Sequence, residues 1–281
     1  MQKKSYSWKV SKKDAKKKIL DFLKEKLLAS NRQVKKALDK GLCKVNGRIE
    51  RFATSLLKEG SLVTLSSTFR ESIQEKKLKS IKILYEDEFF LAVDKPSNFE
   101  CLDKNIHLFF PKKYTLIHRL DKNTTGVLLI SKTQEFKEKM IRNFKNEKVQ
   151  KTYLAWVDGH IKEKTKKIES NLKKIKALHG QSIYGPSSDG KYALTNLKVI
   201  ETYKDKTIVE LKPITGRTHQ LRAHMKQISH PILGDFLYAK RFICKDEVLR
   251  LQLHASEIEF EHPETLENIY ISSEIPDDFL G

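Results

Sequence analysis

The hydrophobic period and the charge of the chain both change near residue 80, and this change constrains the fold more than any other feature. Residues 1–80 hold 22 Lys and Arg against 8 Asp and Glu, whereas residues 81–281 hold 33 against 28. Apolar residues recur at helical spacing in the first part and form strand-like runs in the second. A chain of 281 residues can form one large domain or two unequal ones. The change favours two, so we predict domains at 1–66 and 81–281, joined by a polar linker at 67–80.

The positive charge of the first 80 residues indicates a polyanionic partner. These residues carry +14 of the formal net charge of +19, and each Lys or Arg that neutralises a phosphate releases a counterion and so gains affinity. Nucleic acid is the first expectation, and an anionic membrane is the competing one. The sequence has neither a run of 18 apolar residues nor the apolar core of a signal peptide. We therefore expect a cytoplasmic monomer that binds RNA and no membrane.

The first domain is predicted to contain two helices and a small sheet. Apolar residues recur at helical spacing from Ile19 to Leu28. Asn31 is placed to cap a second helix, which Gly41 ends. The Asn46-Gly47 turn predicts a hairpin, and a further strand is expected at 62–65.

This order of elements resembles the S-four-like RNA-binding domain, which is named after a small-subunit ribosomal protein, over residues 12–66. The resemblance rests on the helix N-R-Q-V-K-K-A-L-D-K-G, the V-N-G hairpin and the K-E-G-S-L-V strand. Members of that family bind structured RNA, so the resemblance implies an RNA-binding surface here, although each lysine taken singly is equally well a solvated side chain. The residues assigned to RNA binding in this domain are Asn31, Arg32, Lys35, Lys36, Lys40 and Lys44.

The second domain is predicted to consist of many strands with short turns and only a few helices. Helices are expected at 133–146, with one apolar face, and at about 217–228. This composition is typical of an α+β fold with a mixed, mainly antiparallel sheet, beside the small N-terminal α/β RNA-binding domain. The predicted strands are 81–85, 89–93, 127–130, 151–157, 193–200, 206–212, 249–260 and 268–272.

The run from His118 to Gly126 places one carboxylate between two basic residues on a turn that leads into an apolar stretch. Burying an ionised carboxylate is costly unless cations or donors hold it charged, so Asp121 between Arg119 and Lys122 can stay an anion at neutral pH. In isolation the segment is more simply a structural turn, since Asp, Asn and Gly are ordinary turn formers. The motifs in the rest of the chain favour a catalytic role for Asp121 over a structural turn.

Three segments match the RluA-type pseudouridine synthases in order and spacing. The first is Val93-Asp94-Lys95-Pro96, and the second is the run from His118 to Gly126. The third is Leu211–Met225, which contains T-G-R-T-H-Q-L-R and continues through His230–Asp235. Lys151-Thr152-Tyr153 lies between the second and the third. The sister family that acts on the small ribosomal subunit usually has Gly in place of the His before R-L-D and lacks T-H-Q.

The resemblance covers residues 81–275 and implies an isomerase that converts uridine to pseudouridine in structured RNA. It makes 23S ribosomal RNA the first expectation and transfer RNA an alternative. The reaction moves the uracil from a nitrogen to a carbon attachment on the sugar, so it requires no cofactor and no metal. It does require a carboxylate. The resemblance assigns this role to Asp121, pairs it with Arg222, and places Tyr153 against the flipped base.

The same resemblance implies further contacts with RNA, with Arg119 filling the gap that the flipped base leaves. The histidines of the motifs are expected to pack and form hydrogen bonds rather than to transfer protons. Two alternatives stay open, since Tyr153 can be a core tyrosine and Arg222 can pair with a carboxylate of a helix instead. The residues implied to contact RNA in this domain are Arg119, His118, Arg217 and His219.

The sequence departs from the family pattern at two positions. Asn98 stands two residues after Lys-Pro, where the family usually has Gly, and Thr125 stands where it usually has Ser. Asn tolerates left-handed backbone angles better than most residues, so we expect Asn98 to keep the turn. Thr125 keeps the hydroxyl. Neither change removes a reacting group.

Other interpretations of the motifs are weaker. Gly185–Lys191 spells G-x-x-x-x-G-K, but Tyr192 stands where a phosphate-binding loop needs Ser or Thr, and the following residues alternate like a strand. The three cysteines are too scattered for a disulfide framework or a zinc site, and we expect them to be reduced packing residues. The serious competitor is a non-catalytic RNA-binding protein of ribosome assembly. The joint presence of Asp121, Tyr153 and Arg222 argues against it.

Overall fold

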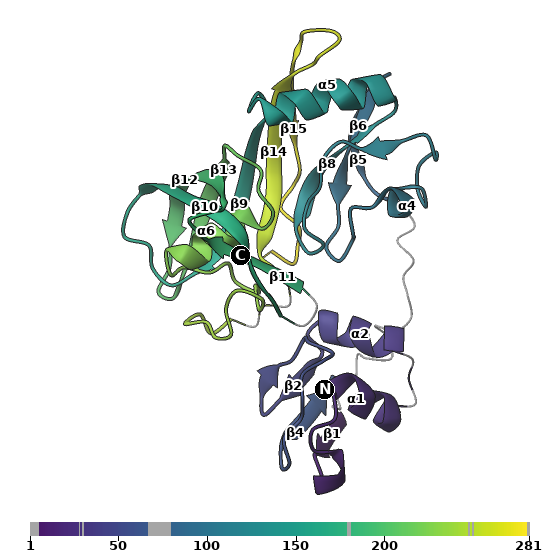
Figure 1. Cartoon of the computed structure of the whole chain (residues 1–281), viewed down its shortest axis with the longest axis vertical. Helices are drawn as coiled ribbons and strands as arrows, with labels where there is room; N and C mark the ends of the chain where they lie inside the picture. The colour runs from purple at the N-terminus through teal and green to yellow at the C-terminus, as the bar shows by residue number, and fades with distance from the viewer. Residues whose placement is uncertain are drawn as a thin grey trace. The chain divides into compact units, whose positions relative to one another are not determined.

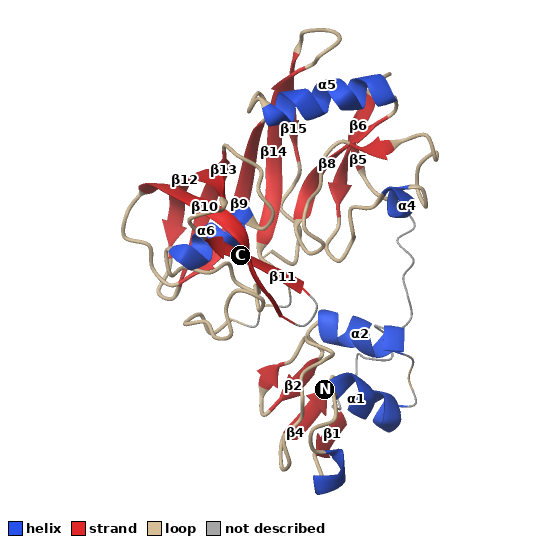
Figure 2. Ribbon diagram, viewed as in Figure 1, coloured by secondary structure: helices blue, strands red, loops and turns tan. Residues whose placement is uncertain are grey.

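The computed structural model of the chain describes residues 6–27, 29, 31–66, 80–178, 181–246, 248 and 250–279. Its contacts define two compact units, a smaller one formed by Met1–Lys79 with Ala177–Gln181 and a larger one formed by Ser80–Lys176 and Ser182–Gly281. Figure 1 labels the elements of each unit, and Figure 2 separates helices from strands. The predicted linker at 67–80 lies, except for Ser80, outside the described residues.

The described residues of the smaller unit form an antiparallel sheet in the order β1-β4-β2-β3 together with the helices α1 and α2. Its first strand was not predicted, because its apolar and polar residues alternate over only four positions, and it is held in the sheet by pairing with β4. The elements are β1 (Tyr6–Lys9), a short 3-10 helix (Lys12–Asp14), α1 (Ile19–Leu27), α2 (Asn31–Asp39), β2 (Cys43–Val45), β3 (Arg48–Ile49) and β4 (Leu62–Leu65).

The apolar faces of α1 and α2 form the core of the smaller unit. Phe22 and Leu23 of α1 and Val34 and Leu38 of α2 are fully buried, as helical spacing of apolar residues requires. The chain leaves α2 through Gly41, whose φ of +67° is left-handed. The prediction of two amphipathic helices on a small sheet is confirmed, and the lysines of α2 lie on its other face.

The larger unit is built on one sheet in the order β11-β10-β12-β13-β9-β14-β8-β6-β5, with β15 beside β14 and β7 beside β8. The predicted α+β class is confirmed. The elements are β5 (Ile83–Glu86), β6 (Phe90–Lys95), α4 (Asp103–Ile106), β7 (Thr115–Leu116), β8 (Thr125–Ser131), α5 (Gln134–Lys145), β9 (Gln150–Asp158), β10 (Thr165–Leu178), β11 (Gln181–Pro186), β12 (Lys191–Thr202), β13 (Lys206–Pro213), α6 (Gln220–Gln227), β14 (Leu253–Glu261) and β15 (Asn268–Ser272).

The two halves of this sheet meet at the parallel pair β8 and β14, whereas β14 with β9 and β8 with β6 are antiparallel. Gly126 is paired with Ala255 at this junction. Its φ is +107°, and a Cβ there would lie 2.1 Å from the Ala255 carbonyl oxygen. Only glycine allows this approach, so Gly126 fixes where the segment before β8 leaves the sheet.

Each half of the sheet is covered by one helix, as Figure 1 shows. Phe136 and Met140 of α5 are buried in a core cluster that includes residues of β6, β8, β14 and β15. Leu221 and Met225 of α6 are buried in a second cluster with residues of β9 and β13. The two helices therefore stabilise the two halves separately, and the junction between the halves lies between them.

Besides α4, β7 and β11, which were not predicted, three elements of the larger unit differ from the predictions for physical reasons. Helix α6 begins at Gln220 rather than at 217, because His219 has a left-handed φ of +56°. Strand β10 was missed because its buried Ile168 and Leu172 are four residues apart, a helical spacing. Between them, Ser170 faces inward and its hydroxyl is hydrogen-bonded to a histidine of α6. The strand expected from 249 begins only at Leu253.

Candidate active site

Asp121 lies in the loop 117–124, which connects β7 to β8. The start of the loop is fixed because the Leu129 amide donates to Nε2 of His118 at 3.1 Å. Its end is fixed because the Thr124 amide donates to the carbonyl of Asp121 at 3.1 Å. Burial lowers the pKa of His118 to about 4. The ring of His118 is therefore neutral and serves as an acceptor inside the protein, and its contact with RNA stays a prediction.

Lys95 and Cys101 hold the middle of the loop. Lys95 is fully buried at the end of β6, and its Nζ donates to the carbonyls of Phe99 and Lys122 at 3.1 and 3.0 Å. The Leu120 amide donates to Sγ of Cys101 at 3.4 Å. Burial lowers the pKa of Lys95 to about 8. The backbone on both sides of the catalytic candidate is thus held by side chains that solvent does not reach.

Arg222 of α6 joins Asp121 to a second carboxylate, that of Asp235. Nη1 donates to Oδ2 of Asp121 at 2.9 Å, and Nε and Nη2 donate to the two oxygens of Asp235 at 2.7 and 2.8 Å. Burial opposes the charge on Arg222, but the two carboxylates outweigh it and raise the pKa of the guanidinium. The arginine therefore stays charged and fixed in one orientation.

The two carboxylates differ in exposure and in how many donors they bind. The Asp235 side chain is 1% exposed and takes a two-pronged contact, whereas the Asp121 side chain is 28% exposed and takes one. Within the described part of the chain, Oδ1 of Asp121 receives no hydrogen bond. This oxygen is the one that the arrangement leaves able to react with a ligand.

The segment His230–Asp235 is part of the family match, but no function was predicted for Asp235 from the sequence. The clue was its glycine, because Gly234 has a φ of +75° and a Cβ there would lie 2.0 Å from the Arg250 carbonyl oxygen. That close approach fixes the carboxylate beside Arg222. Arg222 pairs both with Asp121 and with a second carboxylate, that of Asp235, which lies in the loop after α6 and not in a helix.

His219 and Tyr238 flank the ion pair. Nε2 of His219 lies 3.7 Å from Oδ2 of Asp121, and its Nδ1 lies 3.1 Å from the hydroxyl of Tyr238. The Tyr184 amide donates to the same hydroxyl oxygen at 2.9 Å. The Tyr238 ring packs on the guanidinium of Arg222, 5.0 Å from its centre. Burial lowers the pKa of His219 although Asp121 opposes this, so the imidazole is neutral at pH 7.

Tyr153 lies in the middle of the sheet, on β9 between β13 and β14. Its register partners are Leu211 and Ala255, and its ring packs against core clusters of both halves of the sheet. Burial raises the pKa of Tyr153, and the charge of Asp121 raises it further. Tyr153 is therefore a neutral phenol within the electrostatic range of Asp121.

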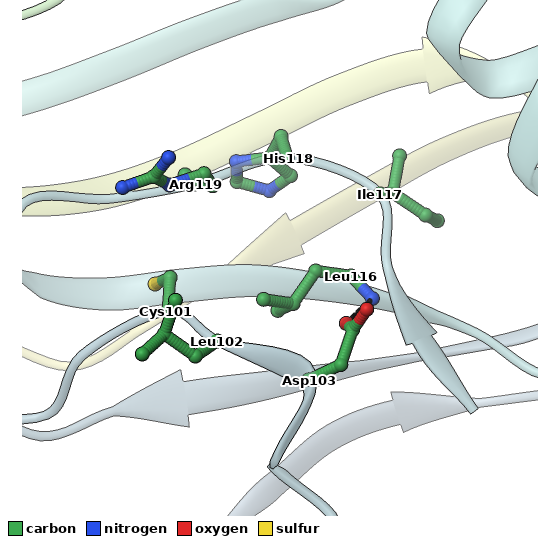
Figure 3. Close-up of a pocket in the computed structure, with 7 residues that line it drawn as sticks. All are labelled: Cys101, Leu102, Asp103, Leu116, Ile117, His118 and Arg119. Atoms are coloured by element: carbon green, nitrogen blue, oxygen red, sulfur yellow. Dashed lines mark hydrogen bonds between the residues drawn. The ribbon is translucent and has the colours of Figure 1, made fainter. Parts of the chain in front are cut away.

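Arg119 is exposed and lines a pocket of about 300 Å³ beside the loop. Figure 3 shows His118 and Arg119 on one side of this pocket and Cys101, Leu102 and Asp103 on the other. The side chains of Arg119 and Asp121 are two residues apart, with the inward-facing Leu120 between them. The loop thus carries a solvent-accessible guanidinium two residues before the candidate carboxylate.

The remaining predicted RNA-binding residues lie on several surfaces. Arg217 is exposed, and its Nε donates to the Tyr192 carbonyl at 2.8 Å. In the smaller unit, Asn31, Lys35 and Lys40 are exposed. Lys36 and Lys44 of that unit are half-buried, and the side chain of Arg32 is not among those described.

The two departures from the family pattern have structural explanations. Asn98 has a left-handed φ of +64°, which confirms that it keeps the turn. The Thr125 hydroxyl lies 2.9 Å from Nδ1 of His254, whose Nε2 lies 3.2 Å from the Ser273 carbonyl. Because a carbonyl only accepts, Nε2 carries the proton and Thr125 donates to Nδ1.

Neither a metal site nor a membrane helix is found among the described residues. No group of three His, Cys, Asp or Glu side chains in this part of the chain is placed to hold a metal ion. None of the described helices is long and apolar enough to span a bilayer. Lys191, which ends the G-x-x-x-x-G-K match, begins strand β12 and not a helix. The three cysteines are buried free thiols.

Comparison with known proteins gives a consistent result. Residues 90–227 match the RNA pseudouridylate synthase family. The chain is 31% identical over 242 residues to ribosomal large subunit pseudouridine synthase C of Buchnera aphidicola subsp. Baizongia pistaciae, which covers 77% of each chain. It is 35% identical over 230 residues to a protein of Helicobacter pylori named as an uncharacterized RNA pseudouridine synthase, with 82% of this chain and 87% of that one covered.

A solved structure also matches the larger part of the chain. Human RNA Pseudouridylate Synthase Domain Containing 1 superposes with a TM-score of 0.62 and 28% sequence identity. The match covers 74% of this chain and 87% of the human one.

Proposed function

Since the chain belongs to the RNA pseudouridylate synthase family and is an RNA pseudouridine synthase, an intramolecular isomerase, we propose that Asp121 is its catalytic carboxylate and that large-subunit ribosomal RNA is its substrate. The first proposal is carried by one observation: Asp121 is held by Arg222 through Oδ2 alone, while its Oδ1 keeps its lone pairs. The second is supported by the relative from Buchnera aphidicola, which is named for the large ribosomal subunit.

The chemistry asks little of the protein beyond a placed anion. The bond between N1 of uracil and the anomeric carbon breaks, the base turns, and C5 forms a new bond to the same carbon. A proton leaves C5 and a proton is gained at N1, so atoms and electrons balance without a further reactant. A carboxylate serves by attacking the anomeric carbon or by taking a proton from the sugar. Both routes use an oxygen that is not blocked by another donor, as Oδ1 of Asp121 is.

Arg222 and Asp235 act on Asp121 by positioning it. The two-pronged contact between Arg222 and Asp235 sets the plane of the guanidinium, and the remaining nitrogen then holds one oxygen of Asp121. A charge-assisted hydrogen bond of this kind fixes both orientation and charge. Lys95 fixes the backbone of the same loop through the Lys122 carbonyl, so the carboxylate is already in place when the substrate arrives.

Tyr153 fits the base rather than the sugar. Its ring offers a flat face for stacking on the displaced uracil. Because burial and the Asp121 charge raise the pKa of its phenol, the group enters the reaction protonated. It can therefore give a hydrogen bond or a proton to the departing uracil anion, and it can take the C5 proton only after its own has left.

The target nucleotide has to leave the RNA stack before Asp121 can reach its sugar. Arg119 is an exposed planar group two residues before Asp121 in the same loop, which supports its assignment to the gap that the base leaves. Lys35 and Lys36 of α2, with Lys40 just after it, then supply affinity for the folded RNA around the target. Much of the affinity is in this way assigned to the smaller unit, and the chemistry to the larger one.

The experiment that tests this proposal maps pseudouridine in RNA from a strain that lacks the gene. Ribosomal and transfer RNA are incubated with the protein or with its Asp121→Asn variant, then analysed by carbodiimide modification and primer extension. New stops in large-subunit RNA made only by the unmutated protein support both parts of the proposal. Stops in transfer RNA alone would overturn the substrate, and stops made equally by the variant would overturn the role of Asp121.

A further inference from the structure

A second pocket, of about 460 Å³, lies where the end of α6 faces the segment 238–241. Its cationic side chains are Lys226 from α6 and Lys240 and Arg241 from the facing segment. All three are exposed, and among the described residues none of them forms an ion pair with a carboxylate. Unpaired cations gathered around one hollow indicate an anionic ligand.

The acidic residue of this pocket is already engaged by the backbone. The two oxygens of Asp158 accept the amides of Ile243 and Cys244, each at 2.9 Å, and the residue is only 6% exposed. These contacts hold the chain just after Lys240 and Arg241 against the end of β9. Asp158 thus orders the cationic segment, and three cations against one carboxylate leave the pocket with a net positive charge.

The pocket shares a wall with the catalytic site. Tyr238 lines the pocket, and its ring lies 5.0 Å from the guanidinium of Arg222, which holds Asp121. Its hydroxyl contacts His219 on the same side. A single tyrosine ring therefore separates the cationic pocket from the catalytic ion pair. The pocket is thus close enough to the ion pair for a phosphate that flanks a nucleotide bound at Asp121 to enter it.

We propose that the pocket formed by Lys226, Lys240 and Arg241 binds a phosphodiester of the substrate RNA next to the target nucleotide. The inference rests on the proposed function, since it assumes that the target sugar is at Asp121. Once the target base has left the stack, its flanking phosphates have to be held to keep the register of the strand. Lys and Arg side chains fix register through phosphates without reading sequence, and Arg adds a flat two-pronged contact.

The test compares two variants of the full chain that remove the same charge at different places. Lys240→Gln with Arg241→Gln neutralises the pocket while leaving Lys226, which belongs to α6. Lys145→Gln with Lys148→Gln neutralises two exposed lysines near the end of α5, on the other half of the sheet. Matching circular dichroism spectra and melting temperatures of the two variants and the parent show that all three are folded.

The first measurement is the salt dependence of binding to the RNA that contains the mapped uridine, by filter binding. The slope of log K against log salt is negative. The proposal expects it to be less steep in the pocket variant than in the parent, by about one unit for each phosphate that the pocket neutralises, and unchanged in the control. A pocket variant with the parental slope overturns the proposal. An equal loss in both variants also overturns it, because the effect is then one of general charge.

The second measurement locates the phosphate. Single methylphosphonate linkages, which carry no charge, are placed one at a time around the target uridine in a short RNA of the mapped site. One neutral linkage next to the target is expected to weaken binding of the parent and of the α5 control but not of the pocket variant. Equal losses in all three proteins at every position would contradict the assignment.

Replacing chloride by inorganic phosphate at constant ionic strength separates a phosphate site from a merely positive surface. We expect phosphate to weaken RNA binding by the parent more than by the pocket variant. No difference between the two salts overturns the phosphate assignment. All three readouts use binding, so they can fail while the parent still forms pseudouridine; conversely, a parent that forms none refutes the proposed function by itself.

Discussion

The loop around Asp121 and the basic face of α2 differ in how their charges are held. Around the loop, the fully buried Lys95 and the buried carboxylate of Asp235 act through short hydrogen bonds that solvent does not reach. On α2 and just after it, Lys35 and Lys40 are exposed to solvent. Buried contacts act through geometry and are little affected by salt, whereas exposed charges act through counterion release and are strongly affected. Substitutions in the two regions should therefore fail in different assays.

The largest effect is expected at Arg222. Arg222→Leu leaves Asp235 buried without its partner, so the free energy of unfolding should fall by ~3–5 kcal/mol, and turnover should be lost with the positioning of Asp121. Urea denaturation measures the first effect. Arg142→Leu removes an exposed arginine of α5 and should change stability by no more than about 0.5 kcal/mol. Similar losses of unfolding free energy in the two variants would mean that the buried Arg222–Asp235 pair stabilises the fold no more than an exposed arginine does.

Tyr153→Phe should slow turnover by about 10²- to 10⁴-fold, the range for loss of a proton-transfer group, with RNA binding retained because the ring still stacks. Single-turnover rates on saturating RNA test this. Tyr238→Phe is the comparison, since it removes a buried phenol that contacts His219 and not the base. A Tyr153→Phe rate equal to that of the parent would limit Tyr153 to stacking.

Much of the fold of the larger unit could be predicted from the sequence, because most of its strands show their burial as a local pattern. Strands such as β6, β8 and β9 are long apolar runs whose period is set by burial, and they were found within about two residues. Strand β10 was not found, because one of its inward positions holds Ser170 instead of an apolar residue. The Ser170 hydroxyl is hydrogen-bonded to a histidine of α6. Such a partner is distant in sequence, so no local pattern reports it.

The site divides in the same way. Asp121, Tyr153 and Arg222 lie in motifs that carry a resemblance, so the sequence could name them. Asp235 and Lys95 act through contacts between segments far apart in the chain, and their roles became visible only when the structure brought Asp235 to Arg222 and Lys95 to the Lys122 carbonyl. Three-dimensional contacts of this kind have no periodicity and are not recoverable from one sequence.

Substitution of Lys35, Lys36 and Lys40 by Gln should give a smaller effect of the opposite kind. Removing these charges should make the slope of log K for RNA binding against log salt less steep, by about one unit for each phosphate that is no longer neutralised. Filter binding between low and moderate salt measures this. Lys112→Gln with Lys113→Gln, two exposed lysines of the larger unit, is the control. An unchanged slope in the α2 variant would move the RNA-binding surface elsewhere.

The smallest effect concerns pH and belongs wholly to the buried region. Burial lowers the pKa of His224 from 6.5 to about 4, so between these values the unfolded chain binds a proton that the folded chain does not. Stability from the neutral ring is complete above pH 6.5 and falls as the pH drops towards 4, by at most ~1.4 kcal/mol per pH unit. His224→Gln should make the pH dependence of the urea midpoint shallower by the share of this one histidine, while His118 keeps its own. His160→Gln, at an exposed position, should leave it unchanged.

The most direct test of the separation between chemistry and binding is to measure both on one RNA with the Asp121→Asn variant. The exchange keeps the shape of the side chain and removes its charge. We expect single-turnover formation of pseudouridine to fall by about 10⁴-fold or more, while the dissociation constant of the RNA stays within a few-fold of the parent value. Retained turnover, or a loss of binding as large as the loss of turnover, would contradict the account and make Asp121 a structural residue of its loop.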